Sequence, residues 1–296
     1  MHHTRRRFLQ GMLTAGLFAG PLAAIDPIRR TGEPQLIPSL AAYSFNRHLA
    51  LNAKRKPTMT LEDFIDFAAG LSLPAVELTA YYFPKTTPEY LDAIKKRCDG
   101  HGLKVSGTAV GNDFCWPDEK KQAQQLDMVK EWIERTARLG GKTMRIFAGS
   151  VKKGDTEADA RKRCLEMIGK ACEFAGKHKV ILAIENHGGI TATADQLLRL
   201  VEPIQSDWYG VNLDTGNFRT ADPYADLAHI APYAVVVQLK TEIFPGGKRQ
   251  EADLKRITDI LRRANYQGYV ALEYEAAEEP RTAVPRYIKQ LKELCK

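Results

Sequence analysis

The sequence has no long apolar segment after its first few dozen residues and no strongly basic region. A helix that crosses a membrane needs roughly 20 apolar residues in a row, so we expect no membrane span. The formal net charge is +7, of which three charges belong to Arg5, Arg6 and Arg7, and the remaining +4 is spread thinly along the chain. No basic stripe with interleaved aromatic residues is present, which argues against a nucleic-acid partner.

Cysteines are few, and none forms a CxxC pair. There are five of them, an odd number. Cys98, Cys164 and Cys172 fall on or near the apolar faces of predicted helices. This pattern favours buried free thiols over a disulfide framework or a thiolate metal site.

The first 24 residues are typical of an export signal. Arg5, Arg6 and Arg7 precede Phe8-Leu9-Gln10, a short apolar stretch (11–19) and a run of small residues (20–24). This segment is too short for a transmembrane helix and predicts a signal peptide. It resembles a twin-arginine signal at all but the last position, where Gln10 replaces the usual lysine. We therefore expect a protein exported by that route to the periplasm or another extracytoplasmic compartment, with its folded domain in residues 25–296.

Short β-rich runs alternate with amphipathic segments over the rest of the chain. No GxGxxG motif follows the first run, so a dinucleotide-binding fold is not indicated. Several runs, such as 234–237, are apolar at every position, as in parallel strands buried on both faces. The eight predicted strands are Leu36–Phe45, Ala75–Ala80, Val105–Val110, Thr143–Phe147, Ile181–Asn186, Tyr209–Asp214, Val235–Lys240 and Tyr269–Tyr274.

Helical spacing fills the segments between these strands. Leu61, Phe64, Ala68 and Leu71 recur every three or four residues, and similar patterns begin at Leu91, Leu165 and Leu254. Eight consecutive βα units, closed by a last helix over Thr282–Leu294, predict an α/β protein that is a single (β/α)8 TIM barrel.

Polar residues end four successive strands, from the fifth to the eighth. These residues are Glu185, Asp214, Gln238 and Glu273. The carboxyl ends of barrel strands meet at one rim, and carboxylates gathered there repel one another unless a cation or protons neutralise them. An all-oxygen ligand set favours Mn²⁺ or Mg²⁺ over zinc. Any one of these residues alone could equally be a salt-bridged or capping side chain.

Strand periodicity adds two neighbours, because residues two apart point the same way. His187 lies on the side of Glu185, as a substrate hydrogen-bonder, an acid or a further ligand, or merely as the cap of the next turn. Lys240 lies on the side of Gln238. It could neutralise a developing enolate oxygen or be an ordinary rim lysine.

Four more residues complete the predicted substrate site. Glu77 and Arg145 point to the rim or the barrel interior, where they contact substrate or pair with one another. Tyr43 is one of several rim aromatics suited to stacking on a sugar face. Asn112 lies in the loop after the third strand, which we expect to act as a lid.

The strand-end motifs resemble the xylose-isomerase-like TIM barrel superfamily, in its sugar phosphate isomerase/epimerase branch. The motifs are AIENHGG (183–189), NLDTGNF (212–218), VVQLK (236–240) and GYVALEYE (268–275), within a resemblance over residues 36–295. The resemblance implies one divalent metal bound through the four strand-end positions, with Glu185 and Glu273 as acid and base. The sequence departs from the pattern at Gln238, where relatives have histidine, and at Asn217, where many have histidine.

These residues predict a metal-dependent carbohydrate isomerase or epimerase that works through an enediolate. Glu185, Glu273, Lys240 and His187 are its expected catalytic residues, and a small-molecule carbohydrate is its expected partner. Two alternatives remain open: a lyase that eliminates from keto-glycosides at the same site, and a sugar-binding barrel without catalysis. An abasic-site endonuclease, another activity of this barrel, is disfavoured because the chain has only seven histidines.

Overall fold

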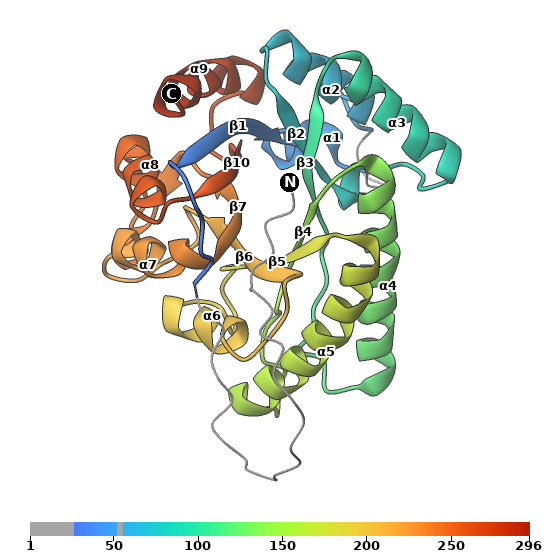
Figure 1. The fold of residues 1–296 in the computed structure, drawn as a ribbon, viewed down its shortest axis with the longest axis vertical. Coiled ribbons are helices and arrows are strands. Elements are labelled where there is room, and N and C mark those ends of the chain that lie inside the picture. The colour runs from blue at the N-terminus through green and yellow to red at the C-terminus, as the bar shows by residue number, and fades with distance from the viewer. Residues whose placement is uncertain (1–26, 52–55) are drawn as a thin grey trace.

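Eight parallel strands form a closed barrel in the computed structural model, which describes residues 27–51 and 56–296 (Figure 1). The predicted signal peptide lies outside the described residues. Around the barrel the strands are β1 (Gln35–Ala41), β10 (Gln267–Leu272), β7 (Ala234–Leu239), β6 (Tyr209–Asp214), β5 (Ile181–Glu185), β4 (Thr143–Ile146), β3 (Lys104–Ala109) and β2 (Ala75–Thr79).

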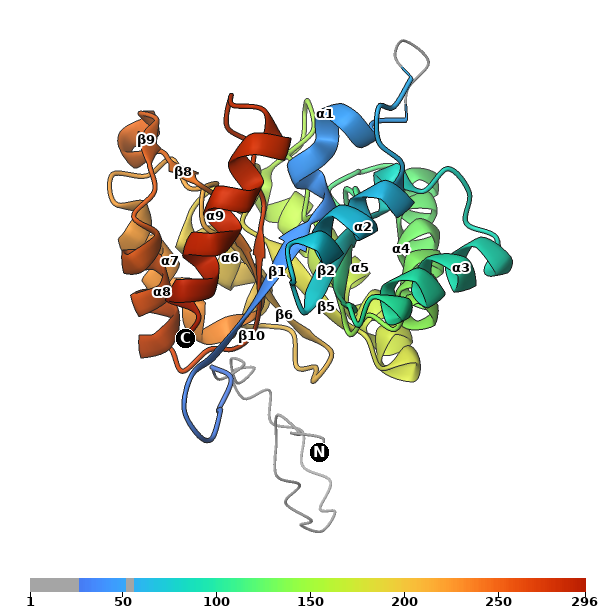
Figure 2. The same ribbon diagram turned by 90° about the horizontal axis from the view of Figure 1, so that it is seen from above.

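Helices surround the strands on the outside, as Figures 1 and 2 show from two directions. The single TIM-barrel domain expected from the sequence is therefore confirmed. The helices are α1 (Asn46–Leu49), α2 (Leu61–Gly70), α3 (Pro88–Gly100), α4 (Glu119–Leu139), α5 (Glu157–His178), α6 (Ala194–Val201), α7 (Pro223–Ile230), α8 (Leu254–Arg263) and α9 (Pro280–Leu294).

The sequence marks the start of most of these helices with a side chain that caps free backbone N–H groups. Thr60 and Thr193 each form a reciprocal capping box with the residue three positions later. Asp118 accepts a hydrogen bond from the backbone of Lys121 at the start of α4. Each such cap stabilises a helix by about 1 kcal/mol. At the other end of α4, Gly140 adopts φ +86°, a left-handed conformation that suits glycine.

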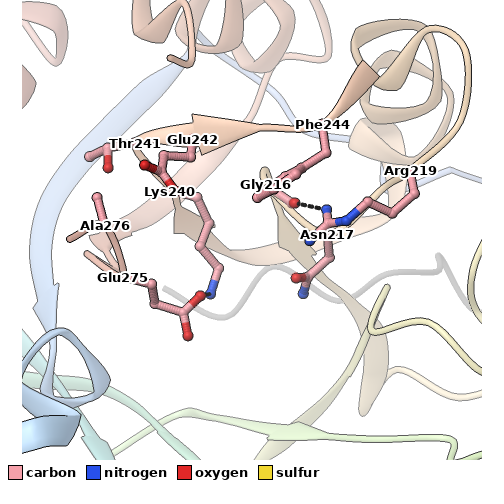
Figure 3. A pocket seen from close by; sticks show the side chains of 9 residues that line it. All are labelled: Gly216, Asn217, Arg219, Lys240, Thr241, Glu242, Phe244, Glu275 and Ala276. Carbon is pink, nitrogen blue, oxygen red and sulfur yellow. Dashed lines mark hydrogen bonds and ion pairs between the residues drawn. The ribbon is translucent and has the colours of Figure 1, made fainter. Parts of the chain in front are cut away.

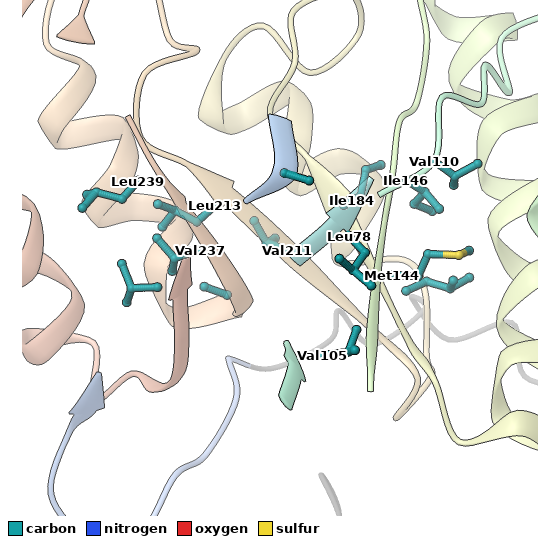
Figure 4. Close-up of a cluster of buried hydrophobic side chains, with 14 of the residues drawn as sticks. Leu78, Val105, Val110, Met144, Ile146, Ile184, Val211, Leu213, Val237 and Leu239 are labelled. Atoms are coloured by element: carbon teal, nitrogen blue, oxygen red, sulfur yellow. The ribbon is translucent and has the colours of Figure 1, made fainter. Parts of the chain in front are cut away.

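The core is built from strand side chains that face the barrel interior and the helices. Figure 4 shows part of it, with Leu78, Ile146, Val211 and Val237 among its members. Every residue of β2, β4 and β6 is buried. Burial on both faces explains the continuous apolar runs in the sequence.

The first strand is shorter than the sequence predicted. Residues Ala42–Phe45 form a 3₁₀ helix, η1, and not the end of β1. The hydroxyl of Ser44 donates to the Leu272 carbonyl at 3.0 Å and accepts from the Tyr274 N–H at 2.9 Å. These bonds turn the chain inward across the end of β10, so the prediction of a strand to Phe45 was wrong.

A short hairpin lies between β7 and α8. Its strands, β8 (Glu242–Ile243) and β9 (Gln250–Glu251), pair antiparallel. This hairpin was not predicted, and it borders the cavity described below.

The composition led to expectations about the cysteines and about membrane spans. The five cysteines, all within the described residues, form no disulfide: Cys98, Cys115, Cys164 and Cys172 are buried, and Cys295 is partly exposed. The prediction of thiols in place of a disulfide framework is confirmed. No helix among the described residues is long and apolar enough to cross a membrane.

Candidate active site

The four predicted strand-end residues gather at one end of the barrel. Glu185 and Asp214 are the last residues of β5 and β6, Gln238 is near the end of β7, and Glu273 directly follows β10. None is more than 4% exposed. The strands are parallel, so their carboxyl ends lie at the same rim. Asp214, for example, lies beside Gln238 on the neighbouring strand. The result is a cluster of ionisable groups with little access to water.

Lys240 lies at the centre of three carboxylates. Its ammonium nitrogen, Nζ, is 2.9 Å from Oε2 of Glu273 and 3.3 Å from Oδ2 of Asp214, and it also pairs with Glu275. Lys240 is 8% exposed, so these contacts are only weakly screened by solvent. Gly216 allows the close packing: a Cβ at this position would lie 2.7 Å from the Cβ of Lys240.

A second cation, Arg145 of β4, serves Glu185. Nε of Arg145 lies 2.9 Å from Oε2 of Glu185, an ion-pair distance without hydrogen-bond alignment. The other carboxylate oxygen accepts a 2.9 Å hydrogen bond from the side-chain amide of Asn217. Arg145 also donates to the Val110 carbonyl at 2.8 Å. Glu185 is thus oriented from both sides.

Gln238 takes part in a buried chain of amides. The Asn212 amide donates to Oε1 of Gln238 at 2.6 Å, and Nε2 of Gln238 donates to Oε1 of Glu77 at 2.8 Å. The sequence left open whether Glu77 and Arg145 pair with one another. Glu77 pairs instead with Gln238, and Arg145 with Glu185.

The crowding of buried carboxyls shifts their protonation. Burial, then repulsion from Glu273, raises the pKa of Glu77 to about 7. Burial also raises the pKa of Glu185 to about 7, although Arg145 opposes the shift. Burial raises the pKa of Asp214 well above its usual range despite Lys240. At neutral pH this site can therefore hold protons that it could give to a substrate.

The lysine in the cluster keeps its charge. Burial alone would lower the pKa of Lys240, but the charges of Asp214, Glu273 and Glu275 more than offset that effect and hold the pKa well above its usual range. A buried ammonium with fixed carboxylate partners is a preorganised source of positive charge.

His187 belongs to a stack at the rim. Its ring lies 4.2 Å, centroid to centroid, from Phe147, and the guanidinium of Arg145 lies 3.9 Å from the centre of the Phe147 ring. Burial of the ring, followed by Arg145 and Lys240, lowers the pKa of His187 to about 4. The imidazole is therefore neutral at pH 7, although the residue as a whole is exposed to solvent. A part in substrate binding stays a prediction.

Tyr43 lies close to the cluster, with its ring centre 5.9 Å from Nζ of Lys240. It is half-buried on η1. Burial, then Glu275 and Glu273, raises the pKa of its hydroxyl. Its position suits contact with a ligand at the rim.

The amide of Asn112 holds the backbone together. Its Nδ2 donates to the Phe147 carbonyl at 2.7 Å, and its Oδ1 accepts from the Phe147 N–H at 2.9 Å. The N–H of Phe114 also donates to the Ala148 carbonyl at 2.9 Å. The loop that we expected to be a lid is thus fixed to the end of β4, and the Asn112 amide is occupied by the backbone.

A cavity of about 220 Å³ opens beside Lys240, with the ammonium directed to Glu275 (Figure 3). It is smaller than the roughly 300–1,000 Å³ of pockets for drug-sized ligands, so it suits a small ligand. The guanidinium carbon of Arg219 lies 3.6 Å from the centre of the Phe244 ring, and Arg219 also donates to the Gly216 carbonyl. The lining residues are Gly216, Asn217, Arg219, Lys240, Thr241, Glu242, Phe244, Glu275 and Ala276.

Three asparagines orient residues of the cluster, and the sequence analysis assigned none of them this part. Asn186 exchanges two 2.9 Å hydrogen bonds with the backbone of Asp214. Asn212 and Asn217 hold Gln238 and Glu185. The available signal was position, because each asparagine stands within three residues of a strand-end carboxylate in the sequence.

The donors expected to hold Mn²⁺ or Mg²⁺ are occupied by other groups. Oε1 of Gln238 accepts from an amide, and the oxygens of Asp214 and Glu273 nearest the centre face the Lys240 ammonium. Oε2 of Glu185 and Oδ2 of Asp214 accept no hydrogen bond, yet each faces a protein cation. Among the described residues, no group of three or more His, Cys, Asp or Glu side chains could hold a metal ion. This arrangement does not fit a divalent ion.

The sequence profile of the family described as "Xylose isomerase-like TIM barrel" matches residues 65–294. The chain belongs to this family. No curated protein sequence matches it. Membership agrees with the closed barrel and with the strand-end motifs.

Solved structures similar to this xylose isomerase-like barrel include several sugar epimerases. L-ribulose 3-epimerase is 18% identical, with a TM-score of 0.70 over 87% of this chain and 93% of that one. The apo form of 3-keto-D-glucoside 4-epimerase from E. coli is 16% identical, with a TM-score of 0.66 over 88% and 100%. The IolI protein, solved with a zinc atom, is 19% identical, with a TM-score of 0.67 over 88% and 96%. At sequence identities this low, the structural similarity establishes a shared fold and nothing finer.

Proposed function

We propose that this protein is a carbohydrate isomerase or epimerase that moves a proton at a carbon next to a carbonyl group. The observation that carries the proposal is the buried cluster in which Glu185 and Glu273 accompany the Lys240 ammonium beside a small cavity. Such a site combines groups that exchange protons with a cation that can hold a negative oxygen. Family membership, and the epimerases among its structural neighbours, support the same reaction class.

The proposed reaction needs two carboxyl groups and one cation. Glu273 takes the proton from the carbon, and the electron pair of the broken C–H bond forms an enediolate. The Lys240 ammonium donates a hydrogen bond to the developing oxyanion. Glu185, whose pKa of about 7 lets it carry a proton near neutral pH, returns a proton. Return to the opposite face of the same carbon is epimerisation. Return to the neighbouring carbon, together with transfer of the hydroxyl proton to the former carbonyl oxygen, is isomerisation.

The proposed substrates are ketoses or keto-glycosides. The cavity of about 220 Å³ favours one sugar ring over a longer saccharide. The carbonyl is required because it acidifies the neighbouring C–H bond. The Mn²⁺ or Mg²⁺ that the sequence indicated is no part of this proposal, because the expected donors face protein groups.

Hydrogen exchange tests the proposal. The purified protein is incubated with ketoses and 3-keto-glycosides in D₂O, and deuterium incorporation and product are followed by NMR and mass spectrometry. We expect Glu273→Gln to lower the exchange rate by about 10²–10⁴-fold, the usual contribution of general acid–base catalysis. A lyase would instead release the aglycone.

The matched control is Glu131→Gln on α4. Glu131 has a 60% exposed side chain paired with Arg135, and it lies outside the cluster. We expect this variant to exchange deuterium at the parent rate. Equal rates for Glu273→Gln and the parent would mean that Glu273 is not the base.

A further inference from the structure

Lys240 supplies the positive charge that a cluster of buried carboxylates requires. Its Nζ lies 2.9 Å from Glu273 and 3.3 Å from Asp214 and pairs with Glu275, so one ammonium contacts carboxylates from two strand ends and a rim loop. We propose that this barrel works without a divalent metal and that Lys240 is its built-in cation. The use of Lys240 in catalysis rests on the proposed function. Its role as the cation that neutralises the carboxylates does not.

The first argument is that Lys240 already occupies the position that a divalent cation would need. The oxygens of Asp214 and Glu273 that face the centre are those that Nζ contacts. A divalent ion bound by the same oxygens would lie within a few ångströms of a buried ammonium. Repulsion between like charges is strong where solvent is excluded, so the ion could bind only if Lys240 left the cluster.

The second argument concerns Gln238, the residue at the histidine position of the family pattern. The Gln238 amide is held at both ends: Oε1 accepts a 2.6 Å hydrogen bond from Asn212, which leaves one lone pair of this oxygen, and Nε2 donates to Glu77. Reversing the amide would turn its oxygen toward the Glu77 carboxyl. In either orientation the oxygen of Gln238 faces a protein group.

The third argument concerns Glu185, which has its own cation. Arg145 lies 2.9 Å from one oxygen, and Asn217 donates to the other. Asn217 is the second position at which the sequence departs from the family pattern, where many relatives have histidine. Both departures replace a histidine with an amide side chain, and both amides bind neighbouring side chains.

The lysine is also placed to act on a substrate. Lys240 and Glu275 line the cavity, and Glu275 has a 39% exposed side chain. A carbonyl oxygen entering the cavity would replace Glu275 as the partner of one N–H, while Asp214 and Glu273 keep the ammonium in place. Lys240 would then stabilise the oxyanion, which is the part that metal polarisation plays in metal-dependent enzymes.

Metal binding tests the inference directly. Protein dialysed against EDTA is titrated with MnCl₂, MgCl₂ and ZnCl₂ in a calorimeter, and untreated protein is analysed for bound metals. We expect the parent to bind no stoichiometric metal. In Lys240→Met the carboxylates lose their cation, and we expect divalent ions to bind at least about tenfold more tightly than to the parent.

Lys255→Met is the matched control, because Lys255 is 74% exposed and pairs with Asp259 on α8. We expect it to behave like the parent. One equivalent of tightly bound divalent metal in the parent would overturn the inference, and so would a folded Lys240→Met variant without gain in metal affinity. If Lys240→Met does not fold, the metal titration of the parent protein decides the inference by itself. A parent that binds no metal and exchanges no deuterium would refute the proposed function but support this inference.

Discussion

At the scale of single residues, Glu77 is a buried acid whose partner is an amide. It is 1% exposed, and its pKa of about 7 means that the folded protein binds a proton more tightly than the unfolded chain does. Between pH 4.5 and 7 the folded state therefore holds more protons, and its stability falls as the pH rises. Above pH 7 the full cost of an ionised, buried carboxylate is present.

Glu77→Gln removes this titration while keeping the acceptor for Gln238. We expect the variant to gain stability over the parent from pH 4.5 to 7 and to keep a constant advantage above pH 7. That advantage is roughly 3.5 kcal/mol at most, because each of the roughly 2.5 pH units contributes about 1.4 kcal/mol. Urea unfolding at several pH values measures the difference. Glu131→Gln, the same change at an exposed side chain, is the matched control. A difference between Glu77→Gln and the parent that does not change with pH would contradict the raised pKa of Glu77.

The sequence predicted which strand-end side chains gather at the rim but not their partners. Glu185, Asp214, Gln238 and Glu273 were expected to converge, because parallel strands end at one rim. That Lys240 lies among three carboxylates was not predictable, because the strand register decides which side chains meet. β6 and β7 shift register between Val211 and Asn212, and no local pattern announces such a shift.

At the scale of strands and loops, two buried asparagines fix the ends of the barrel strands. Asn112 binds the N–H and the carbonyl of Phe147, and Asn186 does the same for Asp214. Each side-chain amide makes the hydrogen bonds to the backbone N–H and carbonyl that a neighbouring strand would otherwise make. Asn112 was expected to contact substrate, and its amide serves the backbone, because a polar residue after a strand has either use and only the neighbouring strand distinguishes them.

Removing either side chain leaves a backbone N–H and a carbonyl unpaired inside the protein. We expect Asn186→Ala and Asn112→Ala each to lose about 3 kcal/mol of unfolding free energy, since each unpaired buried group costs roughly 1–3 kcal/mol. Urea unfolding of the two variants beside the parent measures the losses. A loss below about 1 kcal/mol, the usual net worth of one hydrogen bond, would show that water satisfies the freed groups.

Element boundaries were predicted to within about two residues wherever apolar periodicity ended at a turn or a helix cap. The strand Tyr209–Asp214 was predicted without error. The prediction failed at Ala42–Phe45, where apolar residues continue but the Ser44 hydroxyl bonds to the end of β10. Such a contact joins residues far apart in the sequence and leaves no trace in local periodicity.

At the scale of the whole molecule, the loops after β3, β4 and β5 pack closely against one another at two glycines. A Cβ on Gly149 would lie 1.9 Å from Oδ1 of Asp113, and a Cβ on Gly189 would lie 2.2 Å from the Gly149 carbonyl oxygen. Both glycines have positive φ. At these two glycines the rim has no room for a side chain. The cavity lies on the other side of the rim, among the loops after β6, β7 and β10.

We propose that the protein is exported by the twin-arginine route, as its first residues predict. Replacing Arg5 and Arg6 with lysine should block export and leave the precursor in the cytoplasm. Cell fractionation followed by immunoblotting measures the distribution. A variant with Gln10→Lys, closer to the usual signal, should still be exported, and unchanged export of the double lysine variant would rule out this route.

The ammonium at the centre of the site is joined to the chain by covalent bonds, and this has a thermodynamic consequence. A protein that binds a free ion only when folded gains stability with the concentration of that ion, so its melting temperature follows the supply in its surroundings. A lysine that is part of the chain has no free concentration, so it adds no such concentration dependence to the melting temperature. With Lys240 as its cation, the barrel would emerge from the ribosome complete and would melt at the same temperature in metal-poor and metal-rich media.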